Sequence, residues 1–263
     1  MAEIKKILIA NRGEIVQRAI RTIKEMGKKS VAVYSAGDKN ASYLKHADEA
    51  VCIGGAKSSE SYLNIPALIT AAEMTGCDAI FPGYGFLSEN QDFVEICRLH
   101  NIKFIGPSVE VMEKMADKSK AKEEMVKAGV PVVPGSKGAV RTLDEGKKIA
   151  REIGYPIMAK ASAGGGGRGM RLIKEEKDFD AQYLAASSEA LAAFGDGTMY
   201  LERFINNPRH IEVQVIGDSH GNAIHIGERD CSLQRRHQKV IEESPAILLN
   251  EETRQKLLDV AVK

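Results

Sequence analysis

Several residue types and patterns are scarce in this sequence of 263 residues, and their scarcity excludes whole classes of protein. Tryptophan is absent and aromatic residues make up only 5% of the chain, so a stacking platform for single-stranded nucleic acid is not expected. Neither sign of charge is in excess, with 37 Lys+Arg against 36 Asp+Glu, which argues against a general nucleic-acid-binding surface. The apolar run at residues 7–10 is too short for a signal peptide or a membrane helix. We therefore expect neither nucleic-acid nor membrane partners.

Cysteine is also sparse and widely spaced. The four cysteines are Cys52, Cys77, Cys97 and Cys231. No CxxC pair occurs among them, so neither a zinc knuckle nor a redox dithiol is indicated. Free thiols in a chain long enough to bury a core are typical of a reducing compartment, and the sequence thus predicts a cytoplasmic protein.

The first hundred residues alternate short β-rich runs with helical patterns. A helical pattern follows Asn11, a second is capped by Asn64 with Pro66 near its start and Gly76 past its end, and Ser88 is the expected N-cap of a third. The expected strands are residues 4–10, 31–34, 50–53, 78–81 and 102–105. Strands that alternate with helices predict βαβ units and a parallel sheet covered on both faces.

The pattern changes after about Pro107. Helical stretches are expected at residues 109–115 and 118–128, followed by a Pro/Gly segment, residues 131–138, that is typical of a linker or domain boundary. A further amphipathic helix is expected at residues 142–153, and 217–221 is the expected turn between two strands. The later strands, expected to be antiparallel, are residues 156–161, 170–173, 199–204, 210–216, 222–228 and 239–242. The sequence thus predicts α/β structure in the N-terminal part of the chain and α+β structure in the C-terminal part.

A last helix is expected after Asn250, a good N-cap for the sequence EETRQKLLDVAVK. Its apolar residues have helical spacing, and no stop signal precedes residue 263. We therefore expect the chain to be a fragment of a longer protein.

The glycine run at residues 164–169 is the strongest local feature. Gly164, Gly166 and Gly169 satisfy G-x-G-x-x-G, but that pattern indicates a dinucleotide site only between a strand and a helix, and both flanks here are strand-like. No P-loop motif occurs either. The run is better interpreted as a glycine hairpin that lays backbone N–H groups over phosphates, with Lys160 adding a positive charge. The alternative is a flexible turn beside a surface lysine.

Other segments also hold groups capable of function. The turn at residues 10–14 lacks the dinucleotide fingerprint, and Tyr84 and Glu89 belong either to a cleft or to a structural loop. His210 and His237 are too far apart in sequence to form a metal motif. Residues 228–243 carry a cationic group that fits either an anion site or a solvated charged loop. Its members are Arg229, Arg235, Arg236, His237 and Lys239.

A series of motifs in this order resembles the biotin carboxylases of the ATP-grasp superfamily, over essentially the whole chain. The motifs are NRGEI, SYLNIP, FPGYGFLSEN, FIGPS, DKSKAKE, KAGVPVVPGS, ASAGGGGRGMR, NPRHIEVQV and ERDCSLQRRHQKVIEESPA. The resemblance implies a Rossmann-like N-terminal domain without a dinucleotide site at residues 1–114. It also implies an incomplete α+β ATP-grasp domain at 115–263, with a glycine-rich lid at about 131–204.

The resemblance also implies a reaction and its residues. ATP phosphorylates bicarbonate to carboxyphosphate, which yields carbon dioxide for the carboxylation of biotin on a carrier protein. Lys239 is expected to bind bicarbonate and, with Arg236, to act in catalysis. The expected nucleotide contacts are Lys118, Lys160, Gly166 and Gly167 at the phosphates, Glu202, Arg203, Phe204 and Ile205 at the adenine, His210 near the ribose and phosphates, and Gln234 and His237.

The resemblance places some of the machinery outside this sequence. The acids that hold Mg²⁺ or Mn²⁺ and the general-base glutamate are expected beyond residue 263, and Glu242 and Glu243 do not match that metal segment. Since phosphoryl transfer depends on metal bridging the phosphates, the chain alone is expected to be inactive but to bind nucleotide weakly.

The resemblance also implies partners for the chain, and two alternative functions stay open. The implied partners are a biotin carboxyl carrier, a carboxyltransferase and a second copy of the chain, in a system such as fatty acid biosynthesis. One alternative is another ATP-grasp ligase, such as a carbamoyl-phosphate or purine-pathway enzyme. The other is a non-catalytic nucleotide-binding or dimerising module.

Overall fold

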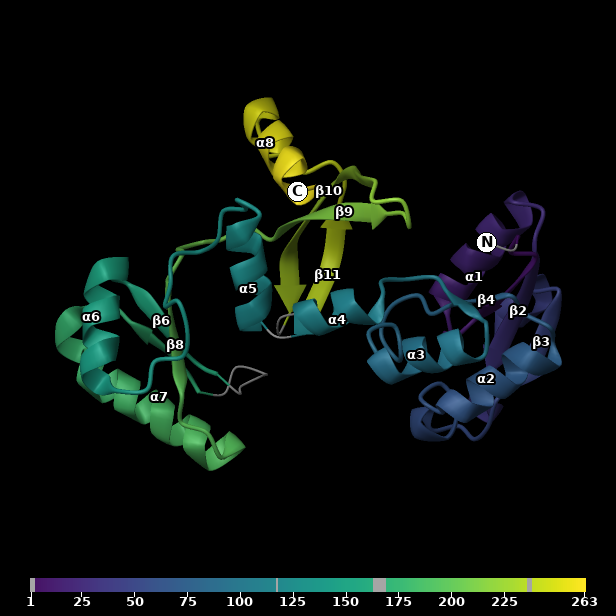
Figure 1. The fold of residues 1–263 in the computed structure, drawn as a ribbon, viewed down its shortest axis with the longest axis horizontal. Coiled ribbons are helices and arrows are strands. Elements are labelled where there is room, and N and C mark those ends of the chain that lie inside the picture. Colours follow the sequence, from purple (N-terminus) through teal and green to yellow (C-terminus); the bar gives the residue numbers. More distant parts are fainter. Residues whose placement is uncertain (1–2, 117, 163–168, 236–237) are drawn as a thin grey trace. The chain divides into compact units, whose positions relative to one another are not determined.

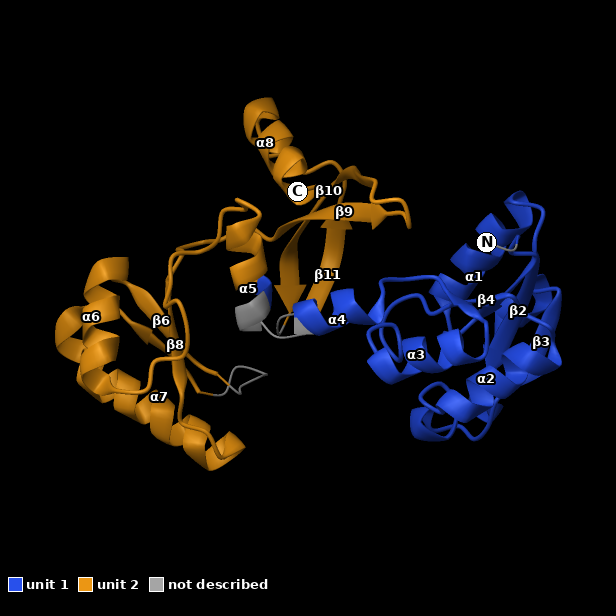
Figure 2. Ribbon diagram, in the orientation of Figure 1, with its two compact units in different colours: residues 1–121 blue, residues 122–263 orange. Residues whose placement is uncertain are grey.

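The chain forms two compact units (Figure 2), unit 1 of Met1–Ala121 and unit 2 of Lys122–Lys263. The structure is a computed structural model that describes residues 3–116, 118–162, 169–235 and 238–263, without the side chains of 116 and 118–120. No helix in these ranges combines the length and apolar character needed to cross a membrane.

Unit 1 is built around a five-stranded parallel sheet (Figure 1) in the order β3-β2-β1-β4-β5. Its strands are β1 (Lys6–Ile9), β2 (Lys29–Tyr34), β3 (Glu49–Cys52), β4 (Ala79–Phe81) and β5 (Lys103–Phe104). Its helices are α1 (Glu14–Glu25), α2 (Ile65–Met74), α3 (Gln91–Leu99) and α4 (Val109–Ala116), with 3₁₀ turns at Ala36–Asp38, Ser42–His46 and Ser58–Glu60. The parallel sheet predicted from the alternating pattern is confirmed.

Both faces of the sheet are buried at its central strands β2, β1 and β4, as their continuous apolar runs require. Ile7 and Ile9 pack with Ile20 of α1 on one face. Leu8 packs with Leu68 of α2 and with residues of α3 on the other face. The alternation of side chains along β1 thus supplies two separate cores.

Unit 2 contains two antiparallel three-stranded sheets, in the orders β7-β6-β8 and β11-β10-β9. The strands are β6 (Ile157–Ala161), β7 (Met170–Ile173), β8 (Met199–Arg203), β9 (Ile211–Gly217), β10 (Ala223–Arg235) and β11 (Gln238–Glu243). The helices are α5 (Lys118–Lys127), whose first residues belong to unit 1, α6 (Leu143–Ile153), α7 (Phe179–Phe194) and α8 (Glu251–Ala261), with a 3₁₀ turn at Glu176–Asp178.

The β7-β6-β8 sheet buries one face only. Ile157, Ala159 and Ala161 of β6 are buried and pack with residues of α6 and α7 (Figure 1), whereas the alternate residues Met158 and Lys160 are partly exposed. Side chains on a strand point alternately to the two faces, so Lys160 lies on the face opposite the helices. This open face is the first place where predicted site residues meet.

Four local expectations differ from the structure. Ser88 is not the N-cap of α3, because Asn90 accepts the capping hydrogen bond from Phe93 N at 2.8 Å. The segment 131–138 is not a linker between the units, since Gly135 forms a β-bridge with Glu202 of β8. Helix α7 was not expected, and β10 continues to Arg235 instead of ending at residue 228.

Candidate functional site

Lys160 and Glu202 meet on the open face of the β7-β6-β8 sheet. The Lys160 ammonium lies 2.5 Å from one oxygen of Glu202, and the Lys122 ammonium lies 3.6 Å from the other. Burial opposes ionisation of Glu202, but the two lysines outweigh this effect and lower the pKa of its carboxyl. The sequence predicted Lys160 and Glu202 as separate phosphate and adenine contacts, and here they form one ion pair.

The outer edge of β8 is occupied by the segment before α6. Ser136 N donates to Leu201 O at 2.8 Å, and Arg203 N donates to Pro134 O at 2.8 Å. Phe204 N donates to Pro156 O at 3.0 Å, while the Ile205 side chain is exposed. The N–H groups of Arg203 and Phe204 thus have backbone acceptors, and the adenine contacts predicted at Glu202, Arg203, Phe204 and Ile205 stay predictions.

A second group of predicted residues meets on the β11-β10-β9 sheet. His210 Nδ1 lies 2.7 Å from Gln234 Nε2, and His210 N donates to Ser232 Oγ at 2.9 Å. His210 Nε2 lies 3.7 Å from Glu212, whose carboxylate also accepts a hydrogen bond from Lys239. The structure thus brings His210 and Lys239 to one carboxylate, with Gln234 beside His210.

Glu212 is the centre of this second group, and its partners form what we call the Glu212 cluster: Glu212, Arg229, Lys239 and Glu242. Arg229 Nε and NH2 donate to one Glu212 oxygen at 2.9 and 2.6 Å, and Lys239 donates to the other. Glu242 lies 3.5 Å from Arg229 and 4.0 Å from Lys239. Two cations and two carboxylates leave the cluster with no net charge.

The cluster fixes the ionisation of its members. The hydrogen bond from Lys239, together with Arg229, lowers the pKa of Glu212 to about 2. The same hydrogen bond raises the pKa of Lys239, so its ammonium stays protonated at neutral pH. A fixed ammonium is what an anion site requires.

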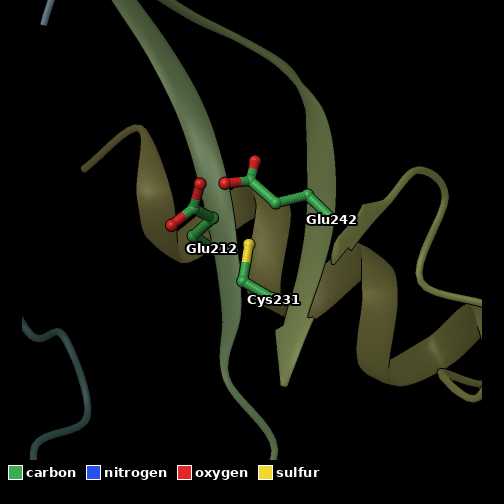
Figure 3. A group of neighbouring side chains, drawn as sticks. All are labelled: Glu212, Cys231 and Glu242. Atoms are coloured by element: carbon green, nitrogen blue, oxygen red, sulfur yellow. The ribbon is translucent and has the colours of Figure 1, made fainter. Parts of the chain in front are cut away.

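Three side chains of this region lie close enough to hold a metal ion (Figure 3): Glu212, Cys231 and Glu242 offer ligand atoms within 4.8 Å of one another. Arg229 and Lys239 already pair with Glu212, and Arg229 also lies 3.5 Å from Glu242. Burial raises the pKa of the Cys231 thiol. A thiol is also a soft ligand, whereas Mg²⁺ takes oxygen ligands. The described residues here do not fit Mg²⁺.

Several predicted site residues fall outside the described parts of the chain. Gly166, Gly167, Arg236 and His237 lie there, as does the side chain of Lys118. Their expected roles stay predictions.

Glu212 is a functional candidate that sequence reasoning missed, and the role of Arg229 was left open. The sequence marked Glu212 only as part of an expected strand, and it placed Arg229 in a cationic group that fits either an anion site or a solvated charged loop. The signal was their register: Arg229 pairs directly with Glu212 across β9 and β10. Opposite charges directly opposed on antiparallel strands stabilise each other.

The loops of unit 1 form a separate arrangement. Asn11 Nδ2 donates to Pro82 O at 2.7 Å and to Tyr84 O at 2.8 Å, which ties the two loops together, and the Tyr84 hydroxyl donates to Glu14. A cavity of about 530 Å³ lies beside α1, and its lining includes Arg12, Arg18, Arg21 and Asp38 but neither Tyr84 nor Glu89.

The Glu212 cluster predicts that the free energy of unfolding falls at acid pH. The pKa of Glu212 is lower in the folded chain, about 2, than the ordinary value of 4.5, so its contribution is present above pH 4.5 and is lost as pH falls toward 2. Glu212→Gln is expected to lower the unfolding free energy by about 2 kcal/mol at pH 7, with a gap that narrows below pH 4.5. Urea unfolding at pH 7, 5, 4 and 3 measures this gap.

Glu243→Gln, which changes an exposed carboxylate on β11, is the matched control and is expected to follow the parent chain. A gap between Glu212→Gln and the parent that stayed constant from pH 7 to pH 3 would contradict the prediction.

Comparisons with known proteins cover nearly the whole chain. Residues 3–112 match the family described as "Biotin carboxylase, N-terminal domain", and residues 117–263 match "Carbamoyl-phosphate synthase L chain, ATP binding domain". A biotin carboxylase of Nostoc sp. is 57% identical over 258 residues, which are 98% of this chain and 58% of that protein. The chain thus spans about half the length of the curated relatives it matches.

Solved structures of biotin carboxylases are also similar to this chain. A biotin carboxylase from Campylobacter jejuni, described as a β,γ-ATP complex, is 70% identical with a TM-score of 0.86, over 99% of this chain and 58% of that one. The biotin carboxylase domain dimer of 2-oxoglutarate carboxylase from Hydrogenobacter thermophilus, described in complex with MgADP, ADP and bicarbonate, is 49% identical with a TM-score of 0.82. This match covers 100% of this chain and 58% of that one.

Proposed function

The chain belongs to the biotin carboxylase family, of which it comprises the N-terminal and ATP-binding domains, and on that premise we propose that it is the nucleotide- and bicarbonate-binding part of an enzyme that carboxylates biotin with ATP. In that reaction an oxygen of bicarbonate attacks the γ-phosphorus and ADP leaves. The resulting carboxyphosphate releases carbon dioxide and phosphate. A ureido nitrogen of biotin gives up its proton to a base and forms a bond to the carbon of the carbon dioxide. The domain boundary near residue 115 and the lid at 131–204 belong to this proposal.

The placement of Lys160 is the observation that carries the proposal. Its ammonium lies on the open face of the β7-β6-β8 sheet and beside Glu202, and Lys160 precedes the first glycine of the run at residues 164–169 by four positions. Backbone N–H groups of a glycine hairpin and a lysine ammonium together suit a polyphosphate. Gly166, Gly167 and Lys118 are the further phosphate contacts that we propose.

Lys239 is the proposed bicarbonate-binding residue, and Arg236 is proposed to act with it in catalysis. Its ammonium is held by Glu212 and stays protonated at neutral pH, so it offers a fixed positive charge to an anion. His210, which directly precedes β9, and Gln234 of β10 lie side by side and are proposed nucleotide contacts. His237 is a further proposed nucleotide contact. Mg²⁺, when bound, would neutralise the phosphates, and its ligands stay predicted outside this chain.

The partners follow from the same proposal. We propose a biotin carboxyl carrier and a carboxyltransferase as partners, a second copy of the chain as dimer mate, and a cytoplasmic location. The match of residues 3–112 to the biotin carboxylase N-terminal domain favours this function over other ATP-grasp ligases, because the ATP-binding match alone is named for carbamoyl-phosphate synthase.

Two measurements on the 263-residue chain test the function. Calorimetric titration with ADP and with ATP is expected to show saturable binding. ADP release from ATP, with Mg²⁺, bicarbonate and free biotin omitted in turn, is expected to show no biotin-dependent turnover. The absence of saturable nucleotide binding would overturn the proposal. A rate that required both bicarbonate and biotin would support the carboxylase function and overturn the expected inactivity.

A further inference from the structure

Glu202 is held by two lysines, one on each carboxylate oxygen. Lys160 of β6 lies 2.5 Å from Oε2, and Lys122 of α5 lies 3.6 Å from Oε1. The side chains of Glu202 and Lys122 are each 28% exposed, and that of Lys160 is 41% exposed. The three side chains form a group with one net positive charge, in which Lys160 is the member most open to solvent.

Gly135 leaves the space in which Lys122 reaches Glu202. It bridges Glu202 across the outer edge of β8, and a Cβ at this position would lie 2.9 Å from Lys122 Nζ and 2.7 Å from Leu201 O. A side chain there would push the Lys122 ammonium away. The approach of Lys122 is therefore part of how the segment before α6 packs on β8.

Nucleotide binding would change the ion pairing of Glu202. The proposed function requires the Lys160 ammonium to turn from Glu202 to the phosphates, and this would remove the nearest cation from a half-buried carboxylate. A partly buried charge without a partner is costly, and the cost subtracts from nucleotide affinity. Lys122 already faces the other oxygen of that carboxylate, so it keeps Glu202 paired when Lys160 leaves.

We propose that Lys122 is a positioning residue for nucleotide binding: it holds the Glu202 carboxylate and thereby frees Lys160 for the polyphosphate. This inference rests on the proposed function. Lys122 acts through Glu202 and Lys160 and need not touch the nucleotide.

The test is the affinity of the whole 263-residue chain for ADP, with adenosine as a probe that lacks phosphates. Lys122→Met is expected to weaken ADP binding about fivefold, the scale of a partly exposed ion pair. It is expected to leave adenosine binding unchanged, and Lys122→Arg is expected to restore ADP binding. Lys127→Met removes a lysine from the same helix, where it pairs with Glu124, and is the matched control.

A double-mutant cycle separates positioning from a general loss of positive charge. In a Glu202→Gln background residue 202 carries no charge that Lys122 could pair with. Lys122→Met is therefore expected to change the ADP affinity of this background less than twofold. Equal weakening in both backgrounds, an unchanged ADP affinity in the single variant, or a parallel loss of adenosine binding would each overturn the inference. If the parent chain binds no ADP, the proposed function itself fails, and the inference fails with it.

Discussion

Phe179→Ala is expected to lower the unfolding free energy of unit 2 by about 3–5 kcal/mol, the range for truncating a buried phenylalanine. Phe179 begins α7 and is fully buried, and its ring stacks on Tyr183 with ring centroids 5.3 Å apart. It also fills the space that Gly146 leaves in α6, where a Cβ would lie 2.9 Å from the ring. The variant would leave a cavity between both helices and the sheet that carries Lys160.

Urea unfolding gives the free-energy change, and hydrogen exchange of individual peptides shows where protection is lost. Loss is expected in β6, β7 and β8 and not in the parallel sheet of unit 1, because the two units have separate cores. Leu184→Ala, in the same helix but at a side chain that is 53% exposed, is the control and is expected to cost less than about 1 kcal/mol. Equal effects of the two variants would show that Phe179 does not anchor this core.

Lys160→Ala is expected to weaken ADP binding by about 10- to 100-fold, the scale of a charge-assisted hydrogen bond to phosphate. The lysine lies on the open face of β6 and is 41% exposed, so its removal disturbs the buried face little. Glu202 keeps Lys122 as a partner in the variant. Calorimetric titration with ADP measures the loss, and urea unfolding checks that stability is retained.

Lys174→Ala is the matched control for this charge, because Lys174 is exposed and directly follows β7. It is expected to bind ADP as the parent chain does. Raising the ionic strength is expected to weaken binding to the parent more than binding to Lys160→Ala, since salt screens the lysine–phosphate attraction. An unchanged ADP affinity in Lys160→Ala would remove this lysine from the nucleotide site.

The parts of the fold that the sequence predicted are those with a clean period or a capping residue. Asn64 and Asn250 cap their helices through hydrogen bonds from Ala67 N and Thr253 N, as expected. Helix α7 was missed because its small and apolar residues lie on all sides: Ala186 and Ala190 are buried while Leu184 and Leu191 are exposed. Apolar residues around the whole helix erase the period by which a buried face is recognised.

Lys160, Lys239 and Glu202 were site candidates from the sequence, whereas Glu212 was not. Lys160 and Lys239 stand out in motifs, whereas the role of Glu212 depends on the register between β9 and β10. That register shifts by one residue between His225 and Glu228, where Gly227 has a φ of +89°. Without this bulge Glu212 would face Glu228 instead of Arg229. A one-residue bulge thus decides whether the Glu212 carboxylate faces a cation. No local sequence pattern predicts this bulge.

The distribution of the cysteines has a practical consequence. Cys77, Cys97 and Cys231 are buried, and burial raises the pKa of each thiol, that of Cys97 to about 12, whereas Cys52 at the end of β3 is exposed. Alkylating reagents attack the accessible thiolate. The unaltered chain therefore takes one fluorophore or spin label at Cys52. A second label introduced in unit 2 would then report the distance between the units in solution as nucleotide is added.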